Sequence, residues 1–190
     1  MLAKVPRGER DEAELVELVQ GGDAAAFDEL VRRYMDRAYA VALSILGTPQ
    51  DAEDAVQTAF IRALERIDQL RPGSPFGPWF YSVLRSTSLN LRRHEGLRSH
   101  EEIPAGASGG PNPERDLARS LTRDRVLDAL AELPEQQRTA VTLYDLEGYS
   151  HQEVAEVLGV AVGTSRAHVH HARKALRERL GPIIESVEEG

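Results

Sequence analysis

Cysteine is absent from this chain of 190 residues, which excludes a disulfide framework and thiolate metal sites. A reducing compartment is therefore permitted, and we predict a cytoplasmic protein. No apolar run approaches the roughly 18–20 residues of a membrane span, and residues 1–14 lack the apolar core of a signal peptide. Aromatic residues are scarce, at 5%, and no stretch alternates as a β-strand does. Because apolar residues still make up 41% of the chain, we expect small helical cores.

Acidic residues outnumber basic ones, and the net charge of −8 argues at first against a nucleic-acid partner. The basic residues are clustered, however. Residues 71–100 and residues 162–180 each carry a net charge of +4, so the rest of the chain carries −16. Because a polyanion binds where the local potential is positive, these two segments are candidates for nucleic-acid contact. The acidic remainder would instead suit a basic protein surface.

Residues 150–180 have the pattern of a helix-turn-helix. Ser150 precedes Glu153 at the spacing of a capping box, and Gly159 suits the left-handed residue that ends a helix. Apolar residues then recur at helical spacing along the second half of the segment, while arginine, lysine and histidine fill the positions between them. A short capped helix, a turn and a longer basic helix can place the second helix in a DNA major groove. The alternative for this segment is an ordinary helical hairpin with a solvated basic face.

The fold that we predict is all-α, with two small helical domains joined by a flexible linker. Residues 1–95 form a four-helix N-terminal domain, in which Asp23 begins one helix and Gly47 ends it. Residues 96–113 are rich in Gly, Pro and Ser and lack apolar periodicity, which indicates the linker. Residues 114–190 form a C-terminal four-helix domain that contains the helix-turn-helix. One helix of this domain runs from Pro134 to Gly148, and its buried candidates are Val141, Leu143, Tyr144 and Leu146.

Four stretches of the chain, in this order, resemble the extracytoplasmic-function (ECF) sigma factors of bacterial RNA polymerase, which are part of the sigma-70 family. They are AAAFDELVRRY (24–34), DAEDAVQTAFIRAL (51–64), PWFYSVLRSTSLNLRR (78–93) and LPEQQRTAVTLYDLEGYSHQEVAEVLGVAVGTSRAHVHHARKAL (133–176). The resemblance implies a subunit that binds core RNA polymerase and directs promoter-specific initiation, while the polymerase does the chemistry. The two domains would then correspond to regions 2 and 4 of the family.

The resemblance also implies site residues. The candidates for contact with the −35 element are Thr164, Ser165, Arg166, His168, His170, Arg173, Lys174 and Arg177. Of these, Lys174 and Arg177 would contact phosphates. The candidates for melting and capturing the −10 element, whose unstacked bases need aromatic and polar surfaces, are Trp79, Tyr81, Arg85, Ser86, Asn90, Arg92 and Arg93. The polymerase-binding candidates are Asp51, Glu53, Asp54 and Gln57. We also expect promoter DNA and an anti-sigma factor as partners.

Four positions depart from the pattern of the family. Histidine stands at His168 and His171, where arginine is common, so phosphate binding would be weaker there. Ser165 replaces a branched apolar residue, and it either packs more loosely or faces DNA. Ser86 stands where an asparagine is common, at the loop that captures a flipped base. The base preference of the family at that loop is therefore not carried over to this chain.

Other functions compete with this prediction. A free-standing repressor or activator would bind duplex DNA as a dimer, but it leaves residues 51–64 and 78–93 without a role. A protein–protein adaptor would leave the basic faces merely solvated. An enzyme is disfavoured because the sequence has no nucleophile elbow, HExxH motif or phosphate loop. His168, His170 and His171 do not converge on one ion along a helix, so we predict no metal and no other cofactor.

Overall fold

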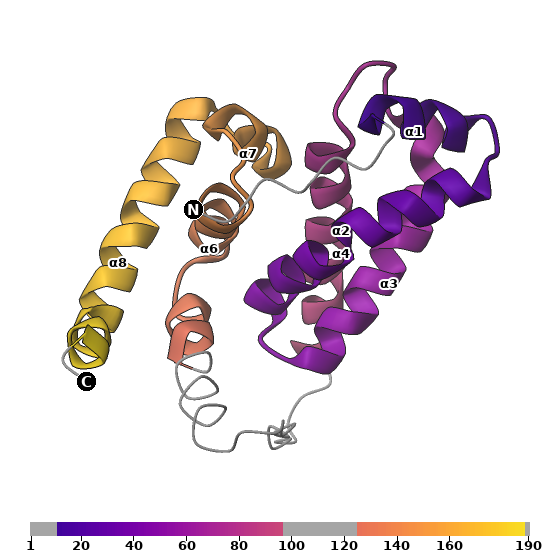
Figure 1. The fold of residues 1–190 in the computed structure, drawn as a ribbon. Coiled ribbons are helices and arrows are strands. Elements are labelled where there is room, and N and C mark those ends of the chain that lie inside the picture. The colour runs from indigo at the N-terminus through magenta and orange to yellow at the C-terminus, as the bar shows by residue number, and fades with distance from the viewer. Residues whose placement is uncertain (1–10, 97–124, 189–190) are drawn as a thin grey trace.

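The computed structural model describes residues 11–96 and 125–188, and every regular element within these ranges is helical (Figure 1). In chain order the elements are α1 (Glu12–Gln20), α2 (Ala24–Leu46), α3 (Pro49–Arg66), η1 (Ile67–Gln69), α4 (Phe76–Gly96), α6 (Glu135–Val141), η2 (Thr142–Leu146), α7 (His151–Leu158) and α8 (Val162–Glu188). Residues 125–131 are helical as well. The predicted all-α fold is thus confirmed. Nearly all of the predicted linker and the predicted start of the second domain lie outside the described residues.

Crossing a membrane demands a helix that is both long and apolar, and none of the helices in the two described ranges meets that demand.

Helix ends follow the capping residues that the sequence offers. The Asp23 carboxylate accepts hydrogen bonds from the backbone N–H groups of Ala25 and Ala26, at 2.9 and 3.2 Å, and so begins α2. Gly47 ends α2 at a φ of 84°, a left-handed conformation that a side chain would strain. Thr48 caps α3, which has a proline in its first turn. Both ends of α2 are as predicted, because capping depends on residues that are close together in the sequence.

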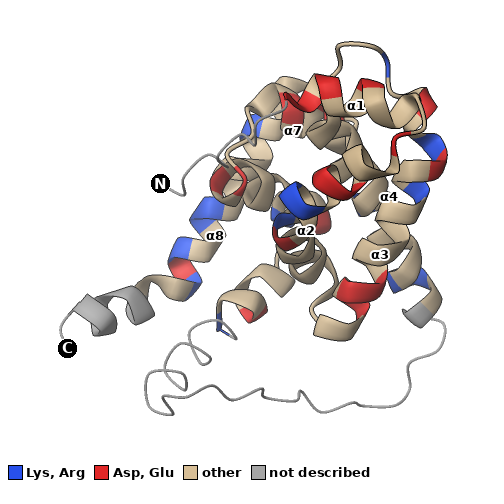
Figure 2. Cartoon of the chain, turned by 45° about the vertical axis from the view of Figure 1, so that its right-hand side comes forward, with Lys and Arg blue, Asp and Glu red and all other residues tan. Residues whose placement is uncertain are grey.

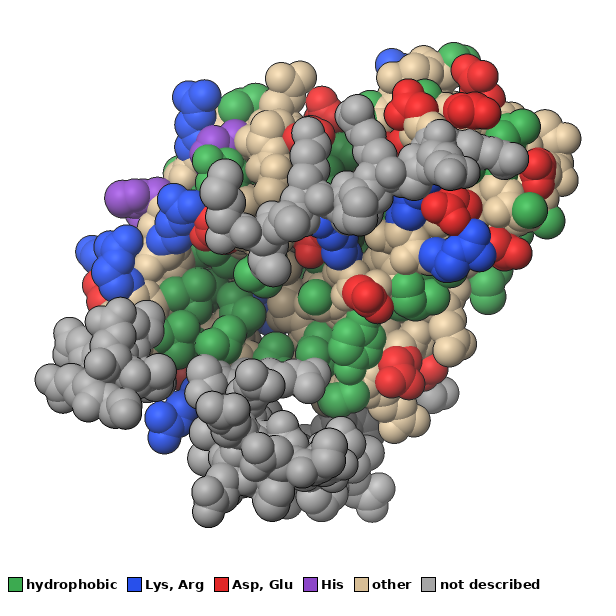
Figure 3. Space-filling model, in the orientation of Figure 1, with side chains coloured by type: hydrophobic (Ala, Val, Ile, Leu, Met, Phe, Trp, Pro, Cys, Tyr) green, Lys and Arg blue, Asp and Glu red, His purple; other side chains and the backbone are tan. Residues whose placement is uncertain are grey.

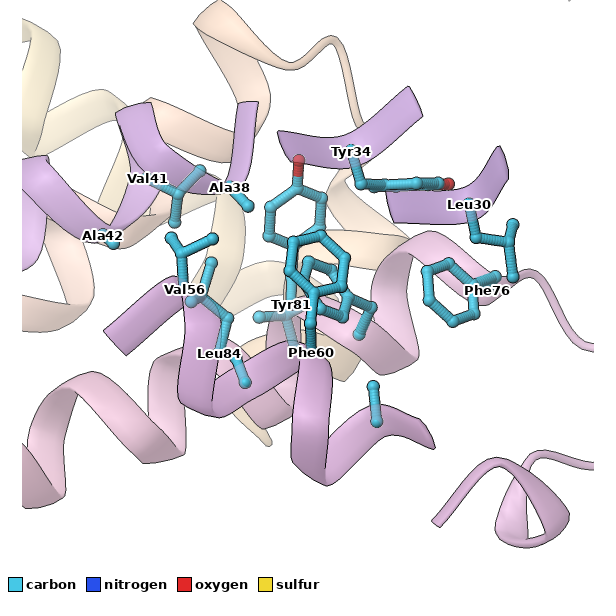
Figure 4. Packing of buried hydrophobic residues seen from close by; sticks show 14 of the residues in the cluster. Leu30, Tyr34, Ala38, Val41, Ala42, Val56, Phe60, Phe76, Tyr81 and Leu84 are labelled. Atoms are coloured by element: carbon cyan, nitrogen blue, oxygen red, sulfur yellow. The ribbon is translucent and has the colours of Figure 1, made fainter. Parts of the chain in front are cut away.

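An aromatic cluster holds α2, α3 and α4 together (Figure 4). Phe80 of α4 is fully buried and stacks on Phe60 of α3 and on Phe76, with ring centroids 4.6 and 5.4 Å apart. Tyr34 of α2 meets the Phe80 ring edge-on at 5.8 Å. The chain has few aromatic residues, but all four phenylalanines belong to this core. The cluster therefore fixes the position of α4 within the first group of helices.

The first group of helices, α1–α4, shares one hydrophobic core with the second group, which runs from residue 125 to α8. The buried cluster around Phe80 continues into Leu143, Val154 and Leu158 of the second group. In particular, α4 packs along α7, and α2 packs against α6. The sequence predicts domains that bury their own helices and does not predict this contact. An apolar residue at the edge of a helix's buried face can be exposed to solvent or can contact another group of helices, and the sequence pattern is the same in both cases.

The helix predicted over residues 134–148 is divided in the structure. α6 ends at Val141, and η2 follows as a π-helical turn. Val141 and Leu143 are buried as predicted, but Leu146 is 46% exposed. A π-helical turn holds more residues than an α-helical turn, so the side chains after it are displaced around the helix axis. Leu146 is therefore turned away from the core that the α-helical periodicity assigns to it.

Candidate nucleic-acid interfaces

The predicted helix-turn-helix is formed by α7 and α8. Ser150 and Glu153 make a reciprocal capping box at the start of α7, and Gly159 ends that helix at a φ of 68°. Val169 and Ala172 are buried on the side of α8 that faces the rest of the second group. This packing sets the angle between the two helices and leaves the other side of α8 in solvent.

The solvent side of α8 is basic, as the Lys and Arg positions along the helix show (Figure 2). Six of the eight predicted −35 residues are exposed there: Thr164, Arg166, His170, Arg173, Lys174 and Arg177. All of these except Thr164 line a groove of about 540 Å³. Blue and purple side chains gather over the same edge of the molecule (Figure 3). Cationic groups along one helix face suit both phosphates and guanine edges.

Ser165 lies on the inward side of α8 and is not among the residues that line this groove. It is fully buried, and its Oγ is 3.4 Å from Nδ1 of His151. Position 165 precedes Val169 and Ala172 by four and seven residues, so it belongs to the same inward stripe. Of the two alternatives for Ser165, the structure shows the packed one, against His151 of α7, and not the DNA-facing one that its place among the −35 candidates requires. His168 is half-buried, with Nε2 buried and unpartnered in the part of the chain that the structure describes.

Arg173 is held in place by the neighbouring η2. Its guanidinium donates to both carboxylate oxygens of Asp145, with Nε 2.9 Å from Oδ2, and lies 5.3 Å from the centre of the Tyr144 ring. The hydrogen bonds to Asp145 raise the pKa of Arg173. Asp145 and Tyr144 could not be predicted as site residues, because no local pattern in the sequence places η2 beside α8.

The arginine-rich helix α4 carries the second set of predicted DNA contacts. Six of the seven predicted −10 residues are exposed or partly exposed: Trp79, Arg85, Ser86, Asn90, Arg92 and Arg93. Two of the seven, Tyr81 and Arg85, contact the second group of helices. Tyr81 is fully buried, in contrast to its expected role at the surface, and Arg85 is paired with a carboxylate. No group of three or more His, Asp or Glu side chains is placed to hold a metal ion within residues 11–96 and 125–188.

Arg85 forms a bidentate ion pair with Glu135 of α6. The Nε and Nη2 atoms of Arg85 donate to the two carboxylate oxygens at 2.7 and 2.9 Å. Their side chains are only 18% and 17% exposed. Burial by itself would raise the pKa of Glu135, but the hydrogen bonds and charge of Arg85 outweigh it and lower that pKa. The pair therefore links the two groups of helices while both partners are charged.

Glu147 lies where η2 meets α2 and α4. Its side chain is 5% exposed, and its Oε2 accepts a hydrogen bond from the Tyr81 hydroxyl at 3.2 Å and is 3.4 Å from Nε of Arg37. Burial raises the pKa of Glu147, although the charge of Arg37 opposes this. Burial also raises the pKa of Tyr81 well above its ordinary value, so the phenol stays protonated and can donate.

Replacing Glu147 with glutamine should make the stability of the protein less dependent on pH. Because the folded-state pKa of this carboxyl is raised, its contribution is fully present below its unfolded pKa and is lost as the pH rises through the folded value. A neutral amide removes that proton-linked contribution. Urea titrations of Glu147→Gln should therefore show a smaller loss of unfolding free energy than the wild type between pH 4.5, the ordinary pKa, and about pH 7.

The matched control for that titration is Glu132→Gln, at a carboxylate that is 62% exposed. The unfolding free energy of Glu132→Gln should depend on pH as that of the wild type does. If Glu147→Gln also showed the wild-type dependence on pH, the buried carboxyl of Glu147 would make no proton-linked contribution to stability.

The exposed side of α3 combines acidic and apolar side chains. The four predicted polymerase-binding residues are exposed or, for the first, partly exposed: Asp51, Glu53, Asp54 and Gln57. Ile61 and Leu64 follow Gln57 at steps of four and three residues and are 61% and 48% exposed. Neighbouring apolar side chains with this exposure are typical of a surface that another protein covers. Neither residue was predicted from the sequence as part of a site, although both lie off the buried stripe of Ala52, Val56, Ala59 and Ala63.

A basic helix-turn-helix, joined in one chain to a second helical unit with its own arginine-rich helix, defines a DNA-binding protein with two separate candidate interfaces. The half of the chain that contains the arginine-rich helix α4 matches the Sigma-70 region 2 family over residues 30–98, and the half that contains the helix-turn-helix matches Sigma-70, region 4 over residues 123–176. The chain belongs to the sigma-70 family, in its ECF group, and acts in promoter-directed transcription initiation.

Individual relatives agree with this assignment. The chain is 36% identical over 166 residues to the ECF RNA polymerase sigma factor SigE of Mycolicibacterium smegmatis, and the match covers 84% of this chain and 64% of that protein. It is 33% identical over 181 residues to the ECF RNA polymerase sigma-E factor of Haemophilus influenzae, covering 90% and 95%. Among solved structures, the sigma factor RpoE of Bartonella quintana, in complex with the anti-sigma factor NepR, matches with a TM-score of 0.69 at 26% identity, covering 82% and 96%.

Proposed function

We propose that this chain binds core RNA polymerase through α3, reads the −35 element as duplex with α8, and melts and holds the −10 element on α4. The observation that carries this proposal is the position of two clusters of exposed basic residues. One cluster, with Arg92 and Arg93, lies on α4 in the segment that matches family region 2, and the other lies on α8 in the segment that matches region 4. Two nucleic-acid contacts on separate helix groups suit a promoter, where one element is read as a duplex and the other as an opened strand.

Arg166 is the residue that we assign to base reading at the −35 element. It is exposed in the first turns of α8 and lines the basic groove. A guanidinium can donate two parallel hydrogen bonds to O6 and N7 of a guanine in the major groove. Lys174 and Arg177, further along the same helix, are assigned to phosphates, which position the protein without reading sequence.

Arg166→Ala should weaken binding to the preferred −35 duplex by about 1–3 kcal/mol and relax the preference at one base pair. Competition titrations with a set of single-base variants of the duplex measure both effects. Arg179→Ala is the matched control on the same helix, since Arg179 is ion-paired with Glu132. It should leave the order of preference among the duplexes unchanged. A uniform loss over all duplexes in Arg166→Ala would contradict base reading.

For the −10 element, α4 offers Trp79 as a stacking surface and Asn90 as a polar group for base edges, with Arg92 and Arg93 beside it for phosphates. Unstacked bases need both kinds of contact, because they have lost their partners in the duplex. Tyr81 would complete this surface once it is uncovered.

The polymerase contact is assigned to the exposed side of α3. Its acidic residues suit a basic partner surface, and Ile61 supplies an apolar centre of the kind that protein interfaces bury. Asp54→Arg should weaken association with core polymerase by about tenfold, because it places a like charge against the partner. Co-sedimentation or anisotropy with core polymerase measures this loss.

The control for the α3 assignment is Glu17→Arg, which makes the same charge change on the exposed side of α1. It should assemble as the wild type does. Binding of −35 duplex by the free chain should be equal in the two variants. Normal assembly of Asp54→Arg with the polymerase would show that the assigned face is wrong.

An anti-sigma factor is the third partner in this proposal. It is supported by the similarity to RpoE, whose structure contains the anti-sigma factor NepR. A protein that covered α3 or α4 would block the polymerase or the promoter.

Selection of DNA from a random library tests the proposed function. With core polymerase present, the recovered DNA should share two separated elements, and the upstream one should be bound as a duplex. A repressor would instead recover a palindromic site without polymerase, with half-sites about one helical turn apart.

A further inference from the structure

The second group of helices covers the part of α4 that the proposed function gives to the −10 strand. Tyr81 is fully buried and the Arg85 side chain is 18% exposed. The groups that meet them are Glu135 of α6 together with Glu147 and Tyr149, which lie between η2 and α7. The part of the candidate strand-binding surface around Tyr81 and Arg85 is therefore already occupied by the same chain.

The covering groups have the chemistry of a single strand of DNA. The Glu135 carboxylate takes two parallel N–H donors from Arg85, which is the geometry in which arginine binds a phosphate. The Tyr149 ring meets the Tyr81 ring edge-on at 5.4 Å, where an unstacked base would find an aromatic surface. The Glu147 carboxylate adds a second anionic group, which accepts from the Tyr81 hydroxyl.

The first turn of α4 is shaped for Tyr149. Gly77 has no side chain, and a Cβ there would collide with the Tyr149 hydroxyl and come within 2.9 Å of the Tyr34 hydroxyl. Tyr149 can lie against α4 only because this position is a glycine. The contact is thus a fitted interface, in which the strand-binding helix and its cover have complementary shapes.

Other contacts hold the two groups together at the end of α2. Arg138 of α6 donates to the backbone carbonyls of Ser44 and Ile45 at 3.2 and 3.1 Å. These carbonyls belong to the last turn of α2, where they lack partners within the helix. The Thr142 hydroxyl is 3.4 Å from the Ser44 hydroxyl, and both residues are buried. The two groups can therefore be joined or separated experimentally without changing α4.

We propose that Glu135, Glu147 and Tyr149 form an intramolecular mimic of the −10 strand, which competes with DNA for α4. This inference rests on the proposed function, because it takes α4 to be the strand-binding helix. Free protein then binds single-stranded DNA at α4 only in the fraction of molecules whose two helix groups have separated. Association with the polymerase would have to hold the groups apart, so that strand capture follows assembly.

The first test weakens the mimic. Trp79 is the single tryptophan of the chain and lies on α4, so its fluorescence reports strand binding there and not at α8. Titration of the free chain with random-sequence single-stranded DNA of about 12 nucleotides should show roughly fivefold tighter binding for Glu135→Gln than for the wild type. Glu132→Gln makes the same charge change at an exposed carboxylate of the same group and should bind as the wild type does. Equal affinity in all three proteins would overturn the proposal.

The second test locks the groups together. The chain has no cysteine, so Ser44→Cys combined with Thr142→Cys introduces the only pair of thiols. The oxidised protein should initiate at least about tenfold less transcription with core polymerase than the same protein after reduction. Because one preparation supplies both states, a folding defect cannot produce the difference. Equal activity in both states, or a pair that fails to oxidise, would contradict the closed arrangement.

The two failures are distinguishable. If neither the reduced double variant nor the wild type initiates with polymerase, the proposed function fails. If both initiate, and the disulfide has no effect, only the mimic fails.

Discussion

Phe80→Ala should lower the free energy of unfolding by about 3–5 kcal/mol, the range for truncating a buried aromatic side chain. Phe80 is fully buried and contacts the rings of Phe60, Phe76 and Tyr34, which come from α3, α4 and α2. The loss therefore combines the transfer of the ring to water with a cavity at the point where three helices meet. Urea unfolding followed by circular dichroism measures it.

The comparison for Phe80→Ala is Ile61→Ala, at an apolar side chain that is 61% exposed on α3. Most of that side chain is already in water, so its removal should cost less than about 1 kcal/mol. Similar losses of unfolding free energy in the two variants would mean that Phe80 is not at the centre of the core. Ile61→Ala should, in addition, weaken association with the polymerase, which separates a role in binding from a role in folding.

Arg138→Met should cost about 3 kcal/mol, although it replaces a charged residue by an apolar one of similar length. The Arg138 guanidinium is 7% exposed and donates to four backbone carbonyls, two of them on α2 and two between residues 131 and 133. Methionine would leave those buried acceptors without a donor, and the cost of an unsatisfied buried group exceeds the gain from an apolar side chain. Unfolding by urea measures the loss.

Arg32→Met is the control for that substitution. Arg32 is 68% exposed and pairs only with Glu29 one turn away, so the change should cost less than about 0.5 kcal/mol. Equal stability of the Arg138 and Arg32 variants would contradict the capping of α2 by the second group of helices.

The local parts of this structure could be predicted from the sequence, and the contacts between its two halves could not. Ser150 and Gly159 specify the ends of α7 through neighbours within a few residues, which a sequence displays directly. Arg85 and Glu135 are 50 residues apart, and nothing in either helical pattern says that they meet. The basic residues of α8 were identified by their charge and spacing.

Burial decided which of the predicted site residues are available at the surface. Ser165 and Tyr81 have the polarity expected of DNA contacts, but both are fully buried. For Ser165, the helical phase shared with Val169 could have shown this. For Tyr81, the covering residues come from another part of the chain, so only the packed structure could show it. Ile61 illustrates the opposite case, since an apolar residue at helical spacing proved to be exposed.

Run-off transcription with core polymerase, the purified chain and a promoter recovered by DNA selection decides whether this chain directs initiation. We expect a transcript from one defined start, which requires both the chain and the polymerase and is lost when either the upstream duplex element or the downstream melted element is scrambled. Tight binding to the same DNA without polymerase, with no transcript when polymerase is added, would contradict it.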